Sequence, residues 1–311
     1  EGNRNFANKL WNAARFIIGN LDKCPDAKPA DPITGLTLAD RWIRSRMTQV
    51  VTDVNRLFEN YMYGEAGRQV YEFFWSELAD WYIEIAKIRL YGNEEKAKET
   101  VSQILNEVLE GTMRLLHPFM PFITEEIWQR LSTNKTTNQR IKTIMIQEWP
   151  KEDGRFVDSK VEAEMERVME IVRAIRNLRA EFKVQPGKEV EVVVVAKELT
   201  GDSYIKLLAK VGALKIVKEL KDKPAQSASA RVAGIEVYLL LAGLVDFSKE
   251  KERLNKEIGS IDLEVARLEK LLKDSNFTAK APPEAIAKQR ERLVELSAKK
   301  KLLNDRISLL S

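Results

Sequence analysis

Apolar residues recur at helical spacing through the first 131 residues of the chain. In the first segment they lie three or four positions apart, at Phe6, Leu10, Ala13, Ile17 and Leu21. This spacing places them on one face of a helix, which we expect to be buried. Segments with the same period cover about residues 37–58, 68–91, 94–116 and 121–131. Short connections between such segments predict an all-helical bundle.

Glycines and prolines mark where these helices are expected to end. We expect a loop at Pro25, Pro29 and Pro32 and a break at Gly64 and Gly67, because neither residue type favours a helix interior. The second helix should begin near Thr37.

The middle of the chain mixes two periods. Residues 140–147 and the β-branched run 189–196 read as strands, and so do residues 214–220 and 234–241. Helices are expected at residues 159–182 and 202–211, and the polar stretch 221–230 is expected to form a flexible turn region. Together these elements predict a small α/β unit.

The tail carries heptad spacing. Its first apolar seam is Leu254, Ile258, Ile261, Val265, Leu268 and Leu272, and its second is Ile286, Leu293, Leu296, Leu303, Ile307 and Leu310. Lys300 and Gln289 occupy two seam positions, and the stretch 275–283 contains prolines that cannot continue a helix. Two seams of equal length predict an antiparallel helical hairpin whose arms are roughly 40 Å long.

The fold class expected from these patterns is mainly α with a small α/β part. We expect a helical bundle at residues 1–150, a small α/β connecting domain at 151–245 and an antiparallel coiled coil at 246–311. A length of 311 residues is sufficient for two or three domains.

Composition narrows the class of protein further. Charged residues make up 32% of the chain and no apolar run approaches the roughly 20 residues of a membrane helix. The single cysteine, Cys24, excludes an intrachain disulfide framework and a Cys-based zinc module, so we expect a reducing, cytoplasmic setting. The net charge of +4 indicates a nucleic-acid partner only if the cations gather on one surface.

One face of the first helix carries the most distinctive polar side chains. Arg4, Asn8, Asn12 and Arg15 follow one another at spacings of four, four and three, with Trp11 beside them. Guanidinium, amide and aromatic groups bind phosphates and contact unstacked bases. A solvated helix face is the alternative, but such faces usually carry Lys and Glu, and asparagine is a poor helix former. We therefore favour a binding surface.

Cations also gather in two other places, with alternatives open at each. Arg173, Arg176, Arg179 and Lys183 lie on one side of the long helix near its end, where they fit phosphate contact or the helix dipole equally well. The tail hairpin alternates Lys and Arg with acids, which suits a protein partner or a nucleic acid equally.

No catalytic constellation is visible in the sequence. The one histidine, His117, precedes a proline and is expected to be a packed or capping residue. Glu125 and Glu126 lie in the first turn of an expected helix, where the helix dipole favours carboxylates. There is no phosphate-binding Gly-rich loop and no cluster of metal ligands. We expect neither a catalytic residue nor a metal site.

Several motifs resemble one enzyme family. "EGNRNFANKLWNAARF" and "LHPFMPFITEEIW" are similar to the anticodon-binding domain of class I aminoacyl-tRNA synthetases of the valine, isoleucine and leucine branch. "IRNLRAEF" followed by "QPGK" resembles the next helix of the valyl and isoleucyl members. "GIEVYLLLAGLVDFSKEKERLNKEI" and "NFTAKAPPEAIAKQRERL" resemble the C-terminal coiled coil of bacterial valyl-tRNA synthetases.

The resemblance implies a C-terminal portion of such an enzyme. The class I ATP-binding signatures, His-x-Gly-His and Lys-Met-Ser-Lys-Ser, are absent, and the chain lacks an initiator Met. A catalytic domain and an editing domain are therefore expected to precede it. The fragment itself would need no cofactor, while the full-length enzyme would use ATP with Mg to attach valine.

The resemblance also implies the partner and its contacts. We expect tRNA(Val), no DNA, no membrane and a monomer. The residues expected at the anticodon stem and loop are Arg4, Asn8, Lys9, Trp11, Asn12, Arg15, Arg41, Trp42 and Arg46. The residues expected at the outer corner of the tRNA are Lys251, Arg253, Lys256, Arg267, Lys270, Lys288, Arg290, Arg292, Lys299 and Lys300.

Two alternatives remain at this point. One is an isoleucyl or leucyl relative, although isoleucyl enzymes commonly end in a Cys-bearing zinc module that one cysteine cannot build. The other is a non-catalytic coiled-coil scaffold that joins proteins, which exposed apolar residues on the outer flanks of the hairpin would favour.

Overall fold

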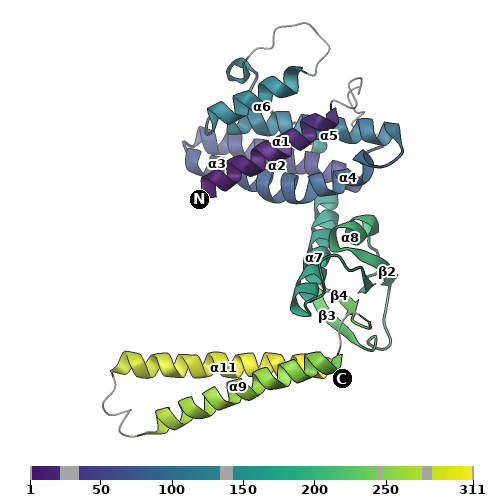
Figure 1. The fold of residues 1–311 in the computed structure, drawn as a ribbon. Coiled ribbons are helices and arrows are strands. Elements are labelled where there is room, and N and C mark those ends of the chain that lie inside the picture. Colours follow the sequence, from purple (N-terminus) through teal and green to yellow (C-terminus); the bar gives the residue numbers. More distant parts are fainter. Residues whose placement is uncertain (1, 22–34, 134–142, 244–246, 275–281, 310–311) are drawn as a thin grey trace. The chain divides into compact units, whose positions relative to one another are not determined.

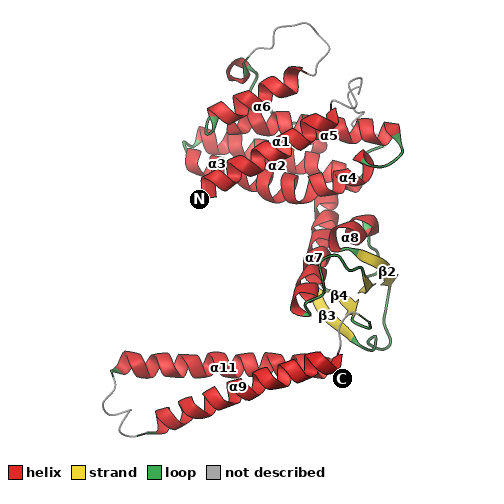
Figure 2. Ribbon diagram, in the orientation of Figure 1, coloured by secondary structure: helices red, strands yellow, loops and turns green. Residues whose placement is uncertain are grey.

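The computed structural model describes residues 2–21, 35–133, 143–243, 247–274 and 282–309 (Figure 1). The chain divides into two compact units, Glu1–Met169 with Thr200–Leu208, and Glu170–Leu199 with Ala209–Ser311. Helices dominate, and the strands gather in one small sheet (Figure 2). The expected combination of mainly α structure with a small α/β part is confirmed. The loop expected at Pro25, Pro29 and Pro32 lies outside the described residues.

The first unit is a helical bundle. Its helices are α1 (Gly2–Leu21), α2 (Leu38–Glu59), α3 (Tyr63–Glu72), the π-helix η1 (Phe73–Tyr82), α4 (Ile83–Leu90), α5 (Glu95–Leu116) and α6 (Pro121–Thr133). Two short 3₁₀ turns follow, η2 (Ile144–Ile146) and η3 (Gly154–Phe156), and then α7 (Ser159–Glu181) and α8 (Asp202–Ala209). α7 begins in the first unit and ends in the second.

The core of this unit is built from the apolar stripes of its helices. Phe6, Leu10 and Ile17 of α1 are almost fully buried, and α1 packs on α5, α6 and η1. Ala14 takes the buried place expected for Ala13, which is half-buried. Packing fixes which face of α1 points inward and therefore leaves its polar face in solvent.

The start of α2 confirms the expectation at Thr37. The Thr37 hydroxyl accepts a hydrogen bond from the backbone N–H of Asp40, and the Asp40 carboxylate accepts one from the N–H of Thr37 at 2.9 Å. This reciprocal capping box satisfies two N–H groups that have no partner inside the helix.

The break expected at Gly64 and Gly67 is wrong, because both residues lie within α3. A Cβ atom at Gly67 would approach the Phe119 ring to 3.1 Å, so glycine permits close packing at this point. The expected strand at 140–147 is also wrong in its described part, residues 143–147. There the Glu125 carboxylate accepts hydrogen bonds from the Thr143 hydroxyl and the Ile144 N–H, which hold a 3₁₀ turn.

Replacing Tyr61 by glycine should raise the free energy of unfolding of this unit by about 1 kcal/mol. Tyr61 follows the end of α2 with a φ of +58°. The N–H of Met62 bonds to the carbonyl of Leu57, which makes the turn a Schellman motif, where glycine is the usual residue. Because the Tyr61 side chain is 80% exposed, its removal costs little packing.

Urea unfolding followed by tryptophan fluorescence measures the effect. All six tryptophans lie between Trp11 and Trp149, so the signal reports only the first unit. Asn60→Gly is the matched control, because Asn60 has a φ of −94° and glycine there should lower stability. A less stable Tyr61→Gly protein would contradict the prediction.

The second unit contains a four-stranded sheet in the order β2-β1-β4-β3. Its strands are β1 (Val190–Val195), β2 (Val211–Val217), β3 (Ser227–Val232) and β4 (Ile235–Leu240). β1 pairs parallel to β2 and antiparallel to β4, and β4 pairs antiparallel to β3. The expected strand at 214–220 is displaced to 211–217, which keeps it paired along the length of β1.

The turn region expected at 221–230 is wrong in its last part, because β3 begins at Ser227. β3 and β4 are joined by Ala233 and Gly234, with φ values of +48° and +76°. Positive φ at both positions is the geometry of the two-residue turn that best matches the strand twist. Because alanine stands at the first of these positions, where asparagine, aspartate or glycine is usual, the sequence does not predict the hairpin.

The tail forms two helices of 27 residues each, α9 (Phe247–Lys273) and α11 (Pro283–Leu309), as expected. The two helices pack on each other (Figure 1). Along the predicted seam, Leu254, Ile261, Leu268, Leu296 and Leu303 are buried. Lys300 holds its seam position by pairing with Asp262 of the facing helix. We call this hairpin the arm; Leu310 and residues 275–281 lie outside the described residues.

Candidate nucleic-acid interface

The polar face of α1 is exposed, as the sequence predicts. We call Arg4, Asn8, Asn12 and Arg15 the α1 strip, and all four side chains are in solvent. Arg4 makes no ion pair among the described residues, and Arg15 has only a 3.5 Å contact from its Nη2 atom to the Asn12 side-chain oxygen. The described part of α1 contains no acidic residue. The two arginines of the strip therefore carry positive charge that no carboxylate pairs among the described residues.

Aromatic rings lie on both flanks of the strip. Toward α6, the guanidinium of Arg130 lies over the half-buried Trp11 ring at 4.8 Å. Toward η1, Lys9 lies 3.8 Å from the centre of the Trp75 ring, which stacks on Tyr71 at 5.8 Å. Rings beside cations provide the stacking surface that unstacked bases use.

Lys9 itself is occupied by the protein. Its ammonium group pairs with Asp80 at 2.6 Å and also donates to the carbonyl oxygen of Trp75. These contacts tie α1 to η1, so Lys9 holds the strip in place instead of extending it. Its predicted contact with RNA is corrected accordingly.

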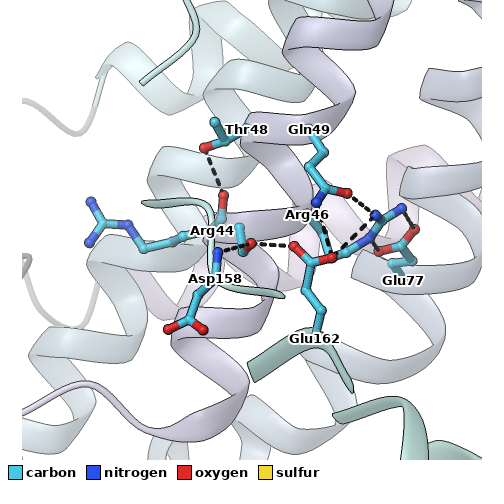
Figure 3. Close-up of polar contacts among 8 residues, drawn as sticks. Arg44, Arg46, Thr48, Gln49, Glu77, Asp158 and Glu162 are labelled. Atoms are coloured by element: carbon cyan, nitrogen blue, oxygen red, sulfur yellow. Dashed lines mark hydrogen bonds and ion pairs between the residues drawn. The ribbon is translucent and has the colours of Figure 1, made fainter. Parts of the chain in front are cut away.

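The three predicted residues of α2 do not extend the strip either. Trp42 is 2% exposed, which places its ring in the core and corrects its predicted role. Arg46 donates from Nε and Nη2 to both carboxylate oxygens of Glu77 and also approaches Glu162 (Figure 3). The hydrogen bonds to Glu77 outweigh the cost of burial and raise the pKa of Arg46. Arg41 is half exposed and pairs with Asp158.

The contacts of Arg46 join three elements. Glu162 of α7 accepts hydrogen bonds from Ser45 and Gln49 of α2, and Ser45 accepts one from the Asp158 N–H at 2.8 Å (Figure 3). Because α2, η1 and α7 meet there, the network has a structural role. Sequence spacing shows that Arg46 is on α2, but not that two carboxylates from distant segments surround it.

Arg179, one of the four cations near the end of α7, is also held by the protein. Arg179 is 8% exposed and donates to the carbonyl oxygens of Gln185 and Lys188 at 3.1 and 2.8 Å. Its burial lowers its pKa. Arg179 therefore holds the turn before β1, and the phosphate contact considered for it is wrong.

The arm carries two kinds of cation. Five of the ten predicted residues form ion pairs, and three of these pairs cross between α9 and α11: Arg292 with Glu264, Lys299 with Glu257 and Lys300 with Asp262. The Lys299 hydrogen bond lowers the pKa of Glu257. The other two, Arg253 and Lys256, pair with acids of their own helix.

The remaining five predicted cations have no carboxylate partner among the described residues. They are Lys251, Arg267, Lys270, Lys288 and Arg290. The last four lie in the final seven residues of α9 or the first eight of α11. Unpaired charge therefore gathers at the end of the arm where the two helices are joined. We call these four the arm-tip cations.

Two large apolar side chains are exposed on the described part of the arm, Leu263 and Val294, each next to at least one charged residue in the chain. Single exposed apolar residues are normal on protein surfaces. The outer flanks of the arm therefore do not show the apolar surface that a protein-joining scaffold would need.

A pocket opens between α1 and α6, next to the strip. It has a volume of about 160 Å³ and is lined by Trp11, Ala14, Arg15, Ile18, Gly19, Ile127 and Arg130. The sequence reading missed Arg130, because its spacing of four from Glu126 is typical of an ordinary surface ion pair, which it also forms at 2.8 Å. Only the packing of α6 on α1 brings it to the strip.

Comparison with known proteins assigns the chain to a family. The family described as the anticodon-binding domain of tRNA ligase matches residues 40–194. The family described as the valyl tRNA synthetase tRNA binding arm matches residues 246–311, which include both helices of the arm. Along its whole length the chain is 42% identical to a valine–tRNA ligase of Carboxydothermus hydrogenoformans. The chain belongs to the valine–tRNA ligase family.

Other valine–tRNA ligases agree with this assignment. The chain is 40% identical to that of Symbiobacterium thermophilum over its whole length, and 39% identical to that of Thermotoga maritima over 93% of it. It spans 35%, 36% and 32% of these three relatives, about a third of their length. The match to the valyl arm decides between valyl-tRNA synthetases and the isoleucyl and leucyl alternatives.

The described part of the chain holds no group of three His, Cys, Asp or Glu side chains arranged for a metal ion. His117 is half-buried, with its Nδ1 atom 2.8 Å from the Thr124 hydroxyl. Among the described helices, none is long and apolar enough to cross a membrane.

Proposed function

We propose that the chain is the tRNA-binding part of a valine–tRNA ligase and holds tRNA(Val) at two places. The α1 strip contacts the anticodon loop, and the arm contacts the outer corner, where the D and T loops meet. The remainder of the full-length enzyme would then attach valine, using ATP with Mg. In this proposal the enzyme is a cytoplasmic monomer, and residues 1–150, 151–245 and 246–311 form the bundle, the connecting domain and the arm.

The observation that carries the proposal is the α1 strip itself. Two arginines that have no carboxylate partner among the described residues flank two asparagines on a face of α1 that the bundle leaves in solvent. Arginine binds phosphate, and amide groups hydrogen-bond to base edges, so the strip carries groups for both tasks. Lys9 ties α1 to η1 through its ion pair with Asp80, and Arg46 ties α2 to η1 through its ion pair with Glu77.

The arm-tip cations support the second contact. Lysine and arginine side chains of this kind bind the phosphate backbone and position an RNA without reading its sequence. The inter-helix ion pairs and the apolar seam keep the two helices together, so the charges are presented on a stiff element.

Replacing Asn12 and Arg15 together by alanine should weaken binding to tRNA(Val) by about tenfold or more, because each lost base contact costs about 1–3 kcal/mol. Binding to a tRNA with a swapped anticodon should weaken less. Filter binding or gel shift with both RNAs measures the difference.

Arg56→Ala is the matched control. Arg56 is an exposed cation on α2 that pairs with Asp53, and it should affect both RNAs little. Equal losses on the two RNAs after the Asn12 and Arg15 replacements would argue against base reading. Failure of the unaltered chain to bind tRNA(Val) in dilute buffer would contradict the proposed function as a whole.

A further inference from the structure

The pocket between α1 and α6 has the size of one aromatic ring. Ala14 and Ile18 of α1 and Ile127 of α6 give it apolar walls, and its volume is about 160 Å³. A cavity of about 150 Å³ lined by apolar side chains accommodates a benzene molecule. The pocket can therefore receive one six-membered ring, but not two stacked bases.

The polar groups of the pocket lie at its rim. Arg130 is held over the Trp11 ring and paired with Glu126, so its planar guanidinium is already ordered. Among the described residues, Arg15 has only the weak contact with Asn12, and its side chain is otherwise exposed. An aromatic ring and a guanidinium plane are the groups on which unstacked bases stack, and a second guanidinium can bind the phosphate that accompanies the base.

Gly19 leaves the entrance of the pocket open. It lies in the last turn of α1, where glycine is less favourable than alanine. An added Cβ atom would meet nothing within 4 Å among the described residues, so no described segment requires glycine there. The missing side chain leaves this side of the pocket accessible.

We infer that this pocket binds one unstacked base of the RNA loop that the α1 strip contacts, and that Arg130 is a binding residue. The inference rests on the proposed function, because Arg15 belongs to both the strip and the pocket. An apolar protein side chain would fit the walls, but it would cover two arginines without supplying negative charge. A nucleotide supplies both the ring and the charge.

The test compares Gly19→Phe, which fills the entrance without removing a charge, with Gly19→Ala. The probe is a stem–loop RNA with the anticodon loop of tRNA(Val), together with a series in which each loop base in turn is replaced by an abasic site. Gly19→Phe should weaken binding of the intact RNA about 5- to 150-fold, the usual value of one stacked base, and Gly19→Ala should leave it unchanged. Arg130→Ala, a change at an exposed residue, should act in the same direction.

For one abasic RNA, the affinity for the unaltered chain should be as low as the affinity of the intact RNA for Gly19→Phe. The affinity of that abasic RNA should not fall further in the Gly19→Phe variant. Equal losses of affinity on all abasic RNAs would refute base binding in the pocket and leave the proposed function standing. So would an unchanged affinity for the intact RNA in a Gly19→Phe or Arg130→Ala variant whose tryptophan-fluorescence unfolding curve is also unchanged. A change in self-association without a change in RNA affinity would assign the pocket to a protein side chain and overturn the inference. No RNA binding by the unaltered chain would refute the proposed function instead.

Discussion

Replacing Asp40 by alanine should lower the free energy of unfolding of the bundle by about 3–5 kcal/mol. The Asp40 side chain is 1% exposed and accepts hydrogen bonds from the Tyr82 hydroxyl at 2.7 Å and from Arg89. It also completes the capping box with Thr37. Because α2, η1 and α4 meet at this carboxylate, its removal leaves a buried hydroxyl and a largely buried guanidinium without their partner.

The protonation of Tyr82 supports this expectation. Burial, with the charge and hydrogen bond of Asp40, raises the pKa of Tyr82 well above its usual value, so the hydroxyl remains a donor. The measurement is urea unfolding followed by tryptophan fluorescence, which reports only this unit.

Asp40→Asn is the matched variant. It keeps the shape and an oxygen acceptor for the cap but removes the charge that faces Arg89, so it should cost less than alanine. If Asp40→Ala unfolded at nearly the same urea concentration as the unaltered protein, the three-helix junction would not depend on this carboxylate.

Deleting the arm, residues 247–311, should weaken tRNA(Val) binding at least tenfold while the preference for the valine anticodon persists. Each phosphate contact contributes about 0.7 to 0.9 to the slope of log affinity against log salt. The loss of four such contacts, one for each arm-tip cation, should flatten that slope by about 3. Filter binding at several salt concentrations measures both the affinity and the slope.

A milder variant separates charge from structure. Replacing Arg267, Lys270, Lys288 and Arg290 by alanine keeps the helices, because alanine is the best helix former, and leaves the buried seam intact. It should reproduce most of the change in slope. Unchanged affinity and slope in both variants would refute the role of the arm.

Local sequence signals were sufficient for the helices and for the arm. The period of Phe6, Leu10 and Ile17 identified the buried face of α1, and the heptad spacing from Leu254 to Leu272 identified the seam. The second helix was expected to begin near Thr37, and in the structure Thr37 caps α2. These features depend on residues within one or two turns of each other, so periodicity alone predicts them.

Long-range packing determined what the sequence reading missed. β3 exists because it pairs with β4 across an Ala233–Gly234 turn, and residues 143–147 form a turn because Glu125 binds them. No local signal marks the π-helix within the predicted third helix. In each case the deciding partner lies in another segment, or the local sequence suits two conformations.

The sequence by itself determined that a helical bundle, a small α/β unit and a coiled-coil arm follow one another, and that α1 has a cationic polar face. Only the tertiary structure decided which of those cations are available: Lys9 and Arg46 are held by Asp80 and Glu77, while Arg4 and Arg15 have no carboxylate partner among the described residues. It also brought Arg130 to the edge of the strip. The physical reason is that helical period depends on neighbours along the chain, whereas the availability of a charge depends on which distant carboxylates the fold places beside it.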